Sequence, residues 1–285
     1  MKTKKVLNLL PDSLFLRLRY YKRFNRILSL KEPQRFTEKM MWYKLYYRND
    51  LMTLCADKYQ VRKYIKDKGY DDILVPLLRV YDDATQIRLD ELPDKFILKG
   101  NNGSETNLVV KNKNDISEQD LIEIVSRWKD NNQAISMGRE WCYKNIKFKI
   151  TAEELLEVNG CDGIDDYKFL CFNGKVHYIW VDKDRFSNHS RTFFDREWNR
   201  ILVESDHPVS DEEIECPWGF DRMLEISESI GKDFPFARVD FYSVNKKIYF
   251  GEITFYPWSG MVEFKPDSFD FEMGRLLEFP KGIDE

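Results

Sequence analysis

Residues 236–254 read FARVDFYSVNKKIYFGEIT and predict a β-hairpin whose two strands are joined by an Asn-Lys turn. Side chains in a strand alternate between its two faces. Arg238 and Asp240 therefore share one face of the first strand, and Glu252 and Thr254 share one face of the second. If the strands pair, Asp240 and Glu252 can converge, and their repulsion requires a cation or proton between them. Such oxygen ligands suit Mg²⁺, which also binds substrate phosphates.

The same side chains allow a second interpretation. Asp240 and Glu252 can be exposed strand acids that form surface ion pairs, with Arg238 as one partner. The pattern alone does not separate this structural role from a metal site.

A second hairpin surrounds a loop of small polar residues. Residues 96–110 read FILKGNNGSETNLVV and predict a strand, a loop and a strand. The loop amides, including those of Gly103 and Ser104, can donate to a phosphate, and Lys99 can add a positive charge. A plain hairpin with a flexible turn fits as well, and the spacing excludes a Walker A loop.

Residues 150–156 read ITAEELL, an apolar strand that ends in paired acids. Adenine recognition needs one donor and one acceptor, and a backbone N–H and C=O at this strand end can supply both. An acidic strand end without a ligand is the alternative.

The composition is that of an ordinary globular chain. It has 285 residues, of which 42% are hydrophobic and 33% charged, enough for one multi-lobed domain or two small ones. The net charge of −4 gives no support for nucleic-acid binding. No run of about 18 apolar residues occurs, so we expect no membrane-spanning helix, and no long apolar segment follows the basic start as in a signal peptide.

Cysteine and histidine give little evidence for metal or nucleophile chemistry. The five cysteines lack metal-ligand spacing and predict reduced thiols in a cytoplasmic protein. Three histidines give little support for a zinc site or a Ser-His-Asp triad. Arg185, His189 and Arg191 lie in a polar stretch and are candidates to hold an acidic substrate, although a solvated loop also explains them.

The remaining patterns predict helices at the start and hairpins toward the end, which indicates an α+β fold. Residues 1–50 form a basic, aromatic helical segment in which Thr37 can cap a helix. Asp57 and Gln60 have the spacing of a capping box for the next helix. Further expected elements are a strand over 73–80, a helix after Ser117, a hairpin over 167–181 and a helix over 212–230 that is interrupted near Pro217.

Residues 1–30 carry eight basic residues and one acid, a net charge of +7 on an otherwise acidic chain. We expect this segment to contact an anionic partner, a membrane face or the polysaccharide-assembly machinery rather than to take part in catalysis.

Taken in order, these motifs resemble the ATP-grasp superfamily from Asp57 to about Pro266. The resemblance implies an ATP-grasp domain over 51–285, in which two α+β lobes hold ATP. Lobe one is expected over about 85–155 and lobe two over about 156–285. The helical segment 1–50 precedes this domain as an extension.

The resemblance implies a set of nucleotide-binding residues. Lys58, next to Asp57 at a helix start, and Lys99, before the mobile flap with Gly103 and Ser104, resemble the two lysines that bind ATP phosphates. The segment that resembles the adenine hinge consists of Glu153, Glu154, Leu155 and Leu156.

The same resemblance assigns the reacting end of the site. Asp166 falls where the superfamily often has a ribose-binding acid, and Lys168 where it has a further cation. Arg238-Val239-Asp240 resembles the Arg-x-Asp of D-alanine–D-alanine ligases, in which the Arg holds the oxyanion and the Asp binds magnesium. Glu252-Ile253-Thr254 resembles their Glu-x-Asn, the remaining magnesium ligands.

Thr254 departs from that pattern, because it stands where the superfamily has Asn. A hydroxyl is a weaker magnesium ligand than an amide carbonyl. The sequence therefore leaves open whether the site holds one or two Mg²⁺ ions.

Several phrases resemble more narrowly the TupA-like ATP-grasp group, named for teichuronopeptide biosynthesis. This resemblance implies a ligase of bacterial surface polysaccharide assembly that joins an amine to a sugar carboxylate or a related acid. The phrases are RFTEKM at 35–40, ADKY at 56–59, DYKF at 166–169, CFNG at 171–174 and GEITF at 251–255.

The expected reaction uses ATP and Mg²⁺ to convert the carboxylate of a small molecule or glycan into an acylphosphate, which an amine then attacks. The acid, the amine and the carrier of the acceptor stay open. The alternatives are a kinase that phosphorylates a glycan hydroxyl, a glycosyltransferase that uses a nucleotide-sugar, and a non-catalytic binding module. We expect the protein in the cytoplasm, with peripheral membrane contact through residues 1–30.

Overall fold

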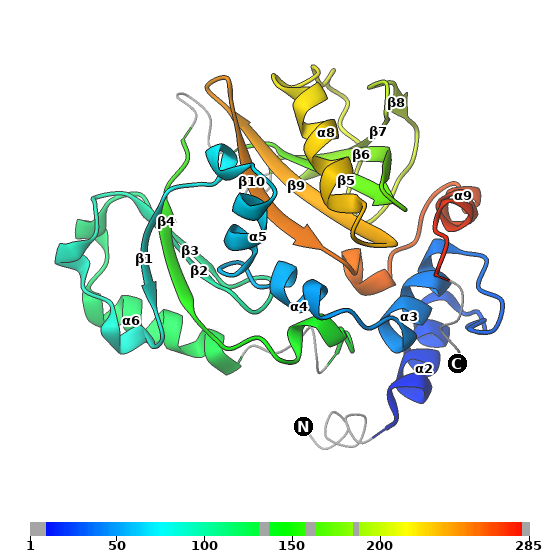
Figure 1. The fold of residues 1–285 in the computed structure, drawn as a ribbon, viewed down its shortest axis with the longest axis horizontal. Coiled ribbons are helices and arrows are strands. Elements are labelled where there is room, and N and C mark those ends of the chain that lie inside the picture. Colours follow the sequence, from blue (N-terminus) through cyan, green and yellow to red (C-terminus); the bar gives the residue numbers. More distant parts are fainter. Residues whose placement is uncertain (1–9, 131–136, 158–163, 185–187, 281–285) are drawn as a thin grey trace. The chain divides into compact units, whose positions relative to one another are not determined.

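A computed structural model describes residues 10–130, 137–157, 164–184 and 188–280 (Figure 1). The chain divides into two compact units, each with its own antiparallel sheet and its own helices, so the predicted α+β class is confirmed. The small unit comprises Asn49–Met137 and Cys142–Cys161, and the large unit comprises Met1–Arg48, Gly138–Trp141 and Asp162–Glu285. The lobe boundaries expected from the sequence stay a prediction.

The small unit contains a four-stranded sheet in the order β1-β4-β2-β3. Its strands are β1 (Leu77–Tyr81), β2 (Phe96–Gly100), β3 (Asn107–Val110) and β4 (Ile150–Glu154). Its α-helices are α4 (Asp50–Ala56), α5 (Val61–Asp67) and α6 (Glu118–Ser126). Short 3₁₀ helices are η1 (Asp71–Ile73), η2 (Ala84–Gln86), η3 (Leu89–Glu91), η4 (Lys113–Asp115) and η5 (Arg127–Asp130), and η6 (Trp141–Tyr143) contains a boundary between the units.

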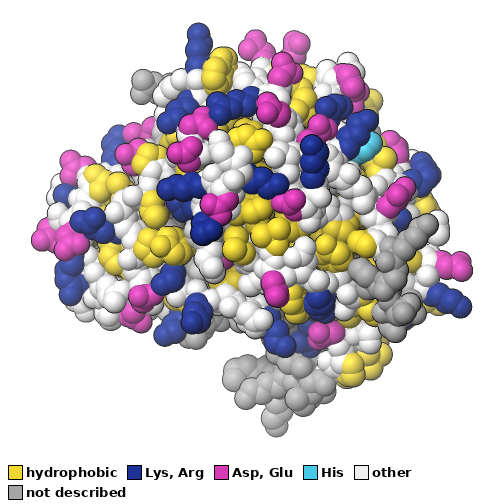
Figure 2. All heavy atoms as spheres, viewed as in Figure 1, with side chains coloured by type: hydrophobic (Ala, Val, Ile, Leu, Met, Phe, Trp, Pro, Cys, Tyr) yellow, Lys and Arg dark blue, Asp and Glu magenta, His cyan; other side chains and the backbone are white. Residues whose placement is uncertain are grey.

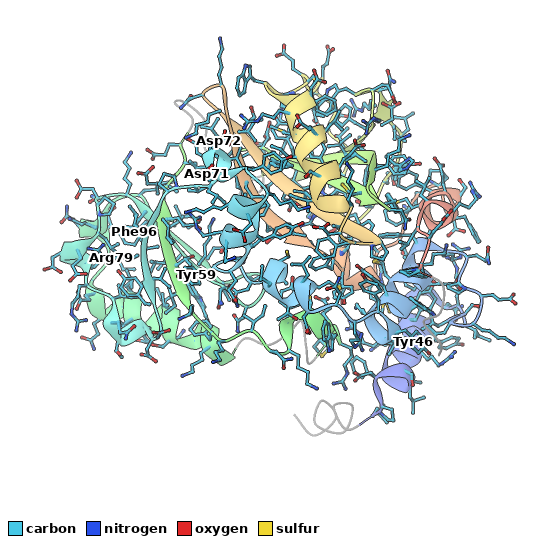
Figure 3. All side chains as sticks on the ribbon, viewed as in Figure 1. Tyr46, Tyr59, Asp71, Asp72, Arg79 and Phe96 are labelled. Atoms are coloured by element: carbon cyan, nitrogen blue, oxygen red, sulfur yellow. The ribbon has the colours of Figure 1, made fainter. Side chains whose placement is uncertain are left out.

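One face of this sheet is apolar and carries the core of the small unit. Phe96, labelled on β2 in Figure 3, and Leu98 pack in one cluster with Leu121 of α6. Ser117 Oγ accepts a hydrogen bond from the Asp120 amide at 3.1 Å, which confirms the predicted cap of α6. Because side chains alternate along β2, the neighbouring Lys99 lies on the opposite, polar face.

The large unit contains a six-stranded sheet in the order β10-β9-β5-β6-β7-β8. Its strands are β5 (Asp166–Phe172), β6 (Lys175–Lys183), β7 (Ser190–Asp195), β8 (Arg200–Ile201), β9 (Phe236–Val244) and β10 (Lys247–Thr254). Its helices are α2 (Asp12–Phe24), α3 (Phe36–Tyr46), α8 (Phe220–Gly231), α9 (Ser268–Leu276) and the short η7 (Pro257–Gly260).

Helix α8 covers one face of this sheet and lies across β5, β6 and β9 (Figure 1). Cys171 of β5 donates a hydrogen bond from Sγ to the Ser227 carbonyl at 3.2 Å, and Gly231 lets the backbones approach closely, since a Cβ there would lie 2.8 Å from the Cys171 Cβ. The opposite face carries Phe172 and Phe236, which pack against Phe36 of α3.

Both predicted hairpins of the large unit are confirmed. Asn173 and Gly174 join β5 to β6 with φ of 48° and 84°, and Asn245 and Lys246 join β9 to β10 with φ of 51° and 56°. Positive φ at both central turn residues matches the right-handed twist of the paired strands.

The predicted cap of α3 by Thr37 is wrong. The helix begins at Phe36, and the cap comes from α9, where the Asp270 carboxylate accepts from the Thr37 amide at 2.9 Å and from Thr37 Oγ1 at 2.8 Å. Arg35 completes this junction with a hydrogen bond of 2.8 Å to each carboxylate oxygen of Asp267. A partner more than 230 residues away cannot be read from a local pattern.

Three other predicted boundaries shift. Asp57 accepts from the amides of Tyr59 and Gln60, but this forms a turn before α5, which begins only at Val61. The strand expected over 73–80 is confined to β1, because Ile73 ends η1. The helix expected over 212–230 begins at Phe220, after Gly219 with φ of 81°.

Among the helices that the structure describes, none combines the length and the apolar character that crossing a bilayer requires. Figure 2 shows basic and acidic side chains interspersed over the visible face, in keeping with a net charge of only −4.

The junction of α3 and α9 gives a stability prediction. A Cβ at Gly274 would clash with the Gln34 carbonyl oxygen and lie 2.9 Å from the Phe36 amide nitrogen. Because backbone atoms cannot yield as a side-chain end does, we expect Gly274→Ala to lower the free energy of unfolding by about 1–3 kcal/mol. Denaturant unfolding measures the change.

Gly103→Ala is the matched control, because a Cβ at Gly103 meets no atom within 4 Å. Equal unfolding free energies for the two variants would contradict the packing described at α9.

Candidate active site

A β-bulge places the predicted metal ligands on one face of the large sheet. Phe250 pairs with Phe241 and Ile253 pairs with Val239, so two residues of β10 stand opposite Asp240 alone. A Cβ at Gly251 would lie 3.1 Å from the Asp240 carbonyl oxygen, a close approach that favours glycine at the bulge. The bulge keeps Phe250 and Ile253 on the α8 face while Glu252 and Thr254 reach Arg238.

The Arg238 guanidinium is the centre of this cluster. Nε and Nη2 donate to the two carboxylate oxygens of Asp240 at 2.7 and 2.6 Å. Nη2 also donates to Glu252 Oε1 and Thr254 Oγ1, each at 2.9 Å. The structure therefore brings together all four residues expected from the hairpin, and Arg238 pairs with the acids as the structural interpretation anticipates, but Arg238 and Asp240 are buried rather than exposed.

Lys168 extends the cluster to the next strand. It stands opposite Asp240 in the β5–β9 register, and its Nζ lies 2.9 Å from Asp240 Oδ2. The same Nζ lies 3.3 Å from Asp166 Oδ2 and 3.9 Å from Asp182 Oδ2. Lys168 thus holds three buried carboxylates within a single sheet face.

Asp182 of β6 connects Lys168 to Arg191 of β7. Arg191 Nε donates to Asp182 Oδ1 at 2.6 Å, and His189 Nε2 lies 3.2 Å from the same oxygen. Asp206 forms a further short ion pair with Arg191. The carboxylates of Asp182 and Asp206 thus neutralise the predicted substrate cation Arg191, and Arg185 lies outside the described residues.

The charged side chains of β9, β5, β6 and β7 form a row, which consists of Arg238, Asp240, Lys168, Asp166, Asp182 and Arg191. Burial and charge act against each other across this charged row. Burial raises the pKa of Asp240, and the nearby Arg238 and Lys168 oppose that rise. Burial opposes the charged form of Arg238 as well, but the Asp240 and Glu252 carboxylates raise the pKa of the guanidinium. Asp182 is buried too, yet Arg191 and Lys168 hold the pKa of its carboxyl well below the usual range. Each charge is therefore stabilised by a neighbour of opposite sign against the cost of its burial.

Tryptophan rings form one wall of the row. Trp180 stands opposite Lys168 on β6 and stacks on Trp258 with ring centroids 4.4 Å apart. The guanidinium carbons of Arg238 and Arg191 lie 5.1 and 5.3 Å from the Trp180 ring centroid. An aromatic face beside two guanidinium groups stabilises them by cation–π attraction and limits their contact with water.

In the small unit, the structure pairs two predicted site residues with each other. Lys99 Nζ donates to Glu153 Oε2 at 2.7 Å across the polar face of β2 and β4. Arg62 of α5 lies with Nη1 3.5 Å from Glu153 Oε1, and its Nη2 donates to the Val75 carbonyl at 2.8 Å. Two cations thus share one buried carboxylate, a local excess of positive charge that suits a phosphate.

The loop after β2 is held at its base and meets Lys58. Asn101 bonds to the backbone of Lys147 and Lys149, and Lys58 Nζ donates to the Gly103 carbonyl at 2.6 Å. Ser104 is exposed. Lys58 and the predicted phosphate loop therefore lie together, and the buried Asn102 Oδ1 accepts no hydrogen bond from any residue in the described part of the chain.

The predicted adenine hinge follows the end of β4. Glu154 is exposed, and its amide donates to the Pro76 carbonyl at 3.0 Å. Leu155 and Leu156 are half-buried and lie beyond the last paired residue of the strand. The binding of adenine by this segment stays a prediction.

Sequence reasoning missed Asp182, Trp180 and Arg62. The alternation of Trp180 and Asp182 along β6 is the signal for the first two, since it matches that of Lys168 and Asp166 on the paired β5. Arg62 lies on a helix, and no local pattern connects it to Glu153.

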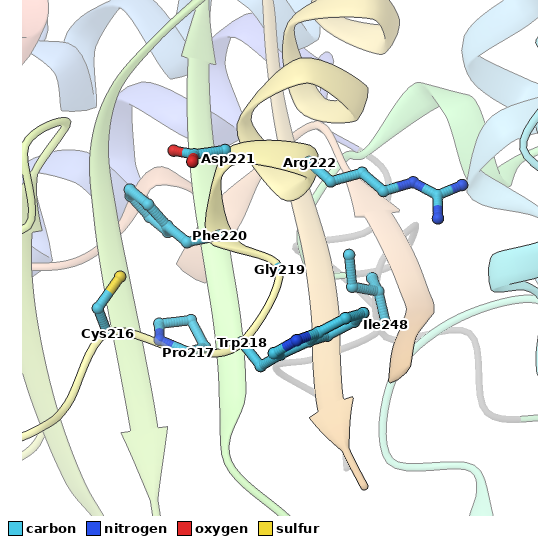
Figure 4. Close-up of a pocket in the computed structure, with 8 residues that line it drawn as sticks. All are labelled: Cys216, Pro217, Trp218, Gly219, Phe220, Asp221, Arg222 and Ile248. Atoms are coloured by element: carbon cyan, nitrogen blue, oxygen red, sulfur yellow. The ribbon is translucent and has the colours of Figure 1, made fainter. Parts of the chain in front are cut away.

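A separate open cavity of about 510 Å³ lies at the start of α8 (Figure 4). Its lining includes Trp218, Phe220 and Ile248, with Asp221 and Arg222 as the charged members. Ile248 alternates with Phe250 on the α8 side of the sheet, so the cavity lies on the face opposite the charged row.

Among the described residues, no group of three His, Cys, Asp or Glu side chains is placed to hold a metal ion.

A family model described as TupA-like ATPgrasp matches residues 38–278, a range that contains both sheets and every predicted site residue. The fold is therefore an ATP-grasp fold, as the sequence motifs imply. Within that class the chain belongs to the TupA-like ATP-grasp family.

Solved structures with similar folds include ligases. D-alanine–D-alanine ligase from Bacillus anthracis, complexed with ATP, is 17% identical to this chain with a TM-score of 0.43. The match covers 70% of this chain and 53% of the ligase. The D-alanine–D-alanine ligase from Helicobacter pylori is 16% identical to this chain with a TM-score of 0.47, and the match covers 85% of this chain and 68% of the ligase. L-amino acid ligase from Bacillus licheniformis is 12% identical to this chain with a TM-score of 0.48, and the match covers 87% of this chain and 53% of the ligase. The chain spans about half the length of most of these structures, and no curated protein sequence matches it.

The buried row gives a pH prediction. The folded-state pKa of Asp182 is depressed, so its stabilisation is present above the ordinary Asp pKa of about 3.9 and is lost as the pH falls toward the folded-state value. We expect Asp182→Asn to lower the free energy of unfolding by about 3–5 kcal/mol at pH 7, because Lys168 and Arg191 lose a buried partner. The difference in the free energy of unfolding between wild type and Asp182→Asn should be smaller at pH 3 than at pH 7.

Denaturant unfolding at both pH values measures this difference. Asp211→Asn, at an exposed site of the same unit, is the control and should leave stability unchanged at either pH. A difference for Asp182→Asn that does not depend on pH would show that the carboxylate charge is not the stabilising feature.

Proposed function

We propose that this protein is an ATP- and Mg²⁺-dependent ligase that joins a carboxylic acid to an amine through an acylphosphate. We further propose that the acid is a uronic acid or a related sugar acid of bacterial surface polysaccharide assembly. The observation that carries the proposal is the contact of one buried guanidinium, Arg238, with Asp240, Glu252 and Thr254. Membership of the TupA-like ATP-grasp family supports the nucleotide part.

The small unit supplies nucleotide contacts in this proposal. Lys58, Lys99 and Arg62 provide positive charge for the phosphates, and the amides of Gly103 and Ser104 provide donors. The segment from Glu153 to Leu156 receives the adenine edge. Lys99 then exchanges part of its interaction with Glu153 for a phosphate oxygen, and Arg62 keeps the carboxylate paired.

The oxygen donors of the large unit fit magnesium. Asp240, Glu252 and Thr254 offer two carboxylates and a hydroxyl, hard ligands of the kind Mg²⁺ takes together with phosphate oxygens. The Glu252 side chain is 38% exposed, so one ligand is accessible to solvent. Bound there, Mg²⁺ would neutralise charge on the ATP phosphates. Asp166 is assigned to the ribose.

The reaction itself is a double displacement. A carboxylate oxygen of the acid attacks the γ-phosphorus of ATP, and the bond to ADP breaks. The amine nitrogen then attacks the acyl carbon, phosphate leaves with the bonding electrons, and the amine loses a proton to solvent. The product is an amide.

Arg238 stabilises the charge that develops in the second step. No described residue accepts a hydrogen bond from its Nη1, while Nε and Nη2 are fixed by Asp240. A guanidinium held in place by its partners can direct Nη1 at the oxyanion of a tetrahedral carbon without reorganising. Lys168, fixed among Asp240, Asp166 and Asp182, adds a second positive charge.

The reaction class is tested by product analysis. We expect ADP and phosphate to form only when an acid and an amine are both present, with an amide detected by mass spectrometry. Uronic acids with a panel of amines are the first substrates to test. A phosphorylated sugar without amide would instead identify a glycan kinase, and binding of nucleotide-sugars without ATP turnover would identify a glycosyltransferase.

The metal assignment is tested by Glu252→Gln. The change removes one charge but keeps an oxygen, and a metal contributes several kcal/mol to charge stabilisation, so we expect turnover to fall by about a hundredfold or more. The Mg²⁺ concentration for half-maximal activity should rise. Glu225→Gln, at an exposed position of α8, is the control and should retain wild-type turnover. Unchanged turnover and unchanged Mg²⁺ dependence in Glu252→Gln would remove Glu252 from the site.

A further inference from the structure

Helix α2 has two different faces. With 100° between successive residues, its buried side chains Phe15, Leu16, Tyr20 and Phe24 lie on one side. This side packs on the rest of the large unit, where Tyr20 Oη and Thr37 Oγ1 lie 3.0 Å apart. The helix is therefore attached along its length.

The opposite side of α2 is apolar and open to solvent. Leu14, Leu18 and Tyr21 follow the i, i+4, i+7 spacing of one helical stripe and are 44, 49 and 56% exposed. Ile27, just beyond the helix, is 84% exposed. These four are among only nine large apolar side chains exposed in the described part of the chain, and all four lie within residues 14–27. Apolar side chains are visible over α2 at the lower edge of Figure 2.

Basic residues border this stripe on both sides. By the same helical geometry, Arg17 lies about 70° to one side of the stripe and Lys22 about 70° to the other, and both are exposed. Arg26, next to Ile27, and Arg23 already have acidic partners, since Arg26 Nη2 lies 2.8 Å from Asp267 Oδ1 and Arg23 Nη1 lies 3.5 Å from Glu263 Oε2. The only acid of α2, Asp12, pairs with Arg139 at 3.2 Å. An apolar stripe bordered by basic side chains is the pattern of a helix that lies in the plane of a membrane interface.

We propose that the α2 stripe, defined as Leu14, Leu18, Tyr21 and Ile27 with Arg17 and Lys22, binds the surface of an anionic lipid bilayer. The apolar side chains enter the headgroup region, while the basic side chains extend along them to lipid phosphates. Because α2 is already folded on the large unit, binding does not have to order the helix. The proposal does not depend on the proposed ligase activity.

Charge favours a bilayer over a second copy of the chain. The segment 10–30 has five basic residues and one acid, whereas the whole chain has a net charge of −4. Glu263 and Asp267 pair with Arg23 and Arg26, so the positive charge of the segment rests on Arg17, Arg19 and Lys22. An anionic surface therefore attracts this segment and repels the rest, which fixes one orientation. Two copies that meet at this stripe would bring basic borders together, and like charges oppose that contact.

The test is flotation of the full-length protein with vesicles. We expect binding to vesicles of phosphatidylglycerol and phosphatidylcholine, and at least about tenfold weaker binding to phosphatidylcholine alone. Leu14→Ser with Leu18→Ser should weaken binding to the anionic vesicles by about tenfold or more, because two large apolar side chains no longer leave water. Lys22→Glu should also weaken it, and most strongly at low salt.

Leu202→Ser is the matched control, because Leu202 is an 80% exposed leucine of the same unit away from α2. It should bind like wild type, and thermal unfolding should show that all variants stay folded. Equal binding by wild type and the double variant would overturn the proposal. So would a concentration-dependent dimer, seen by sedimentation without lipid, that the double variant abolishes.

Discussion

The structure of the large unit depends on one constraint: a row of charges lies inside a sheet face that excludes most water. Arg238, Lys168 and Arg191 alternate with Asp240, Asp166 and Asp182 over four neighbouring strands, and each group is held by a partner of opposite sign. Removing one member takes a partner from at least one other buried charge, which costs more than the pair itself contributes. The strand register is therefore fixed by charge as well as by apolar packing, because a shift of one residue would place every charge on the α8 face.

The same row accounts for the chemistry that we propose. Side chains that already hold each other in place need no reorganisation when charge develops nearby, and an aromatic wall of Trp180 and Trp258 reduces screening by water. The small unit also holds cations by ion pairing, but with fewer charges, since Lys99 and Arg62 share the single carboxylate of Glu153. In both units, ion pairs hold the cations in position, as our proposal requires of groups that bind a phosphate or an acyl oxygen.

Much of this arrangement follows from local patterns. Alternation places Arg238, Asp240, Glu252 and Thr254 on one side of a hairpin, and the turn residues define both hairpins of the large sheet. The bulge at Gly251 was not predicted, although a glycine inside a strand is its usual signal. Asp182 and Arg62 were missed because their roles depend on which strands and helices become neighbours. The cap of α3 was assigned to Thr37, since a local hydroxyl is visible in sequence and a distant carboxylate is not. The roles of the site residues in binding and catalysis stay predictions.

The Asp270 cap also has a consequence for synthesis of the chain. Helix α3 emerges from the ribosome early, but the carboxylate that binds its first turn is 233 residues further along. At about 5–20 residues per second, this separation corresponds to roughly 12–47 seconds of translation. Phe172 and Phe236 of the sheet, which pack on Phe36, are synthesised within that interval, and helix α9 completes the contacts of α3 only at its end. The nascent chain therefore exposes the apolar side chains of α3 early, and this helix can complete its native docking only after α9 has been synthesised.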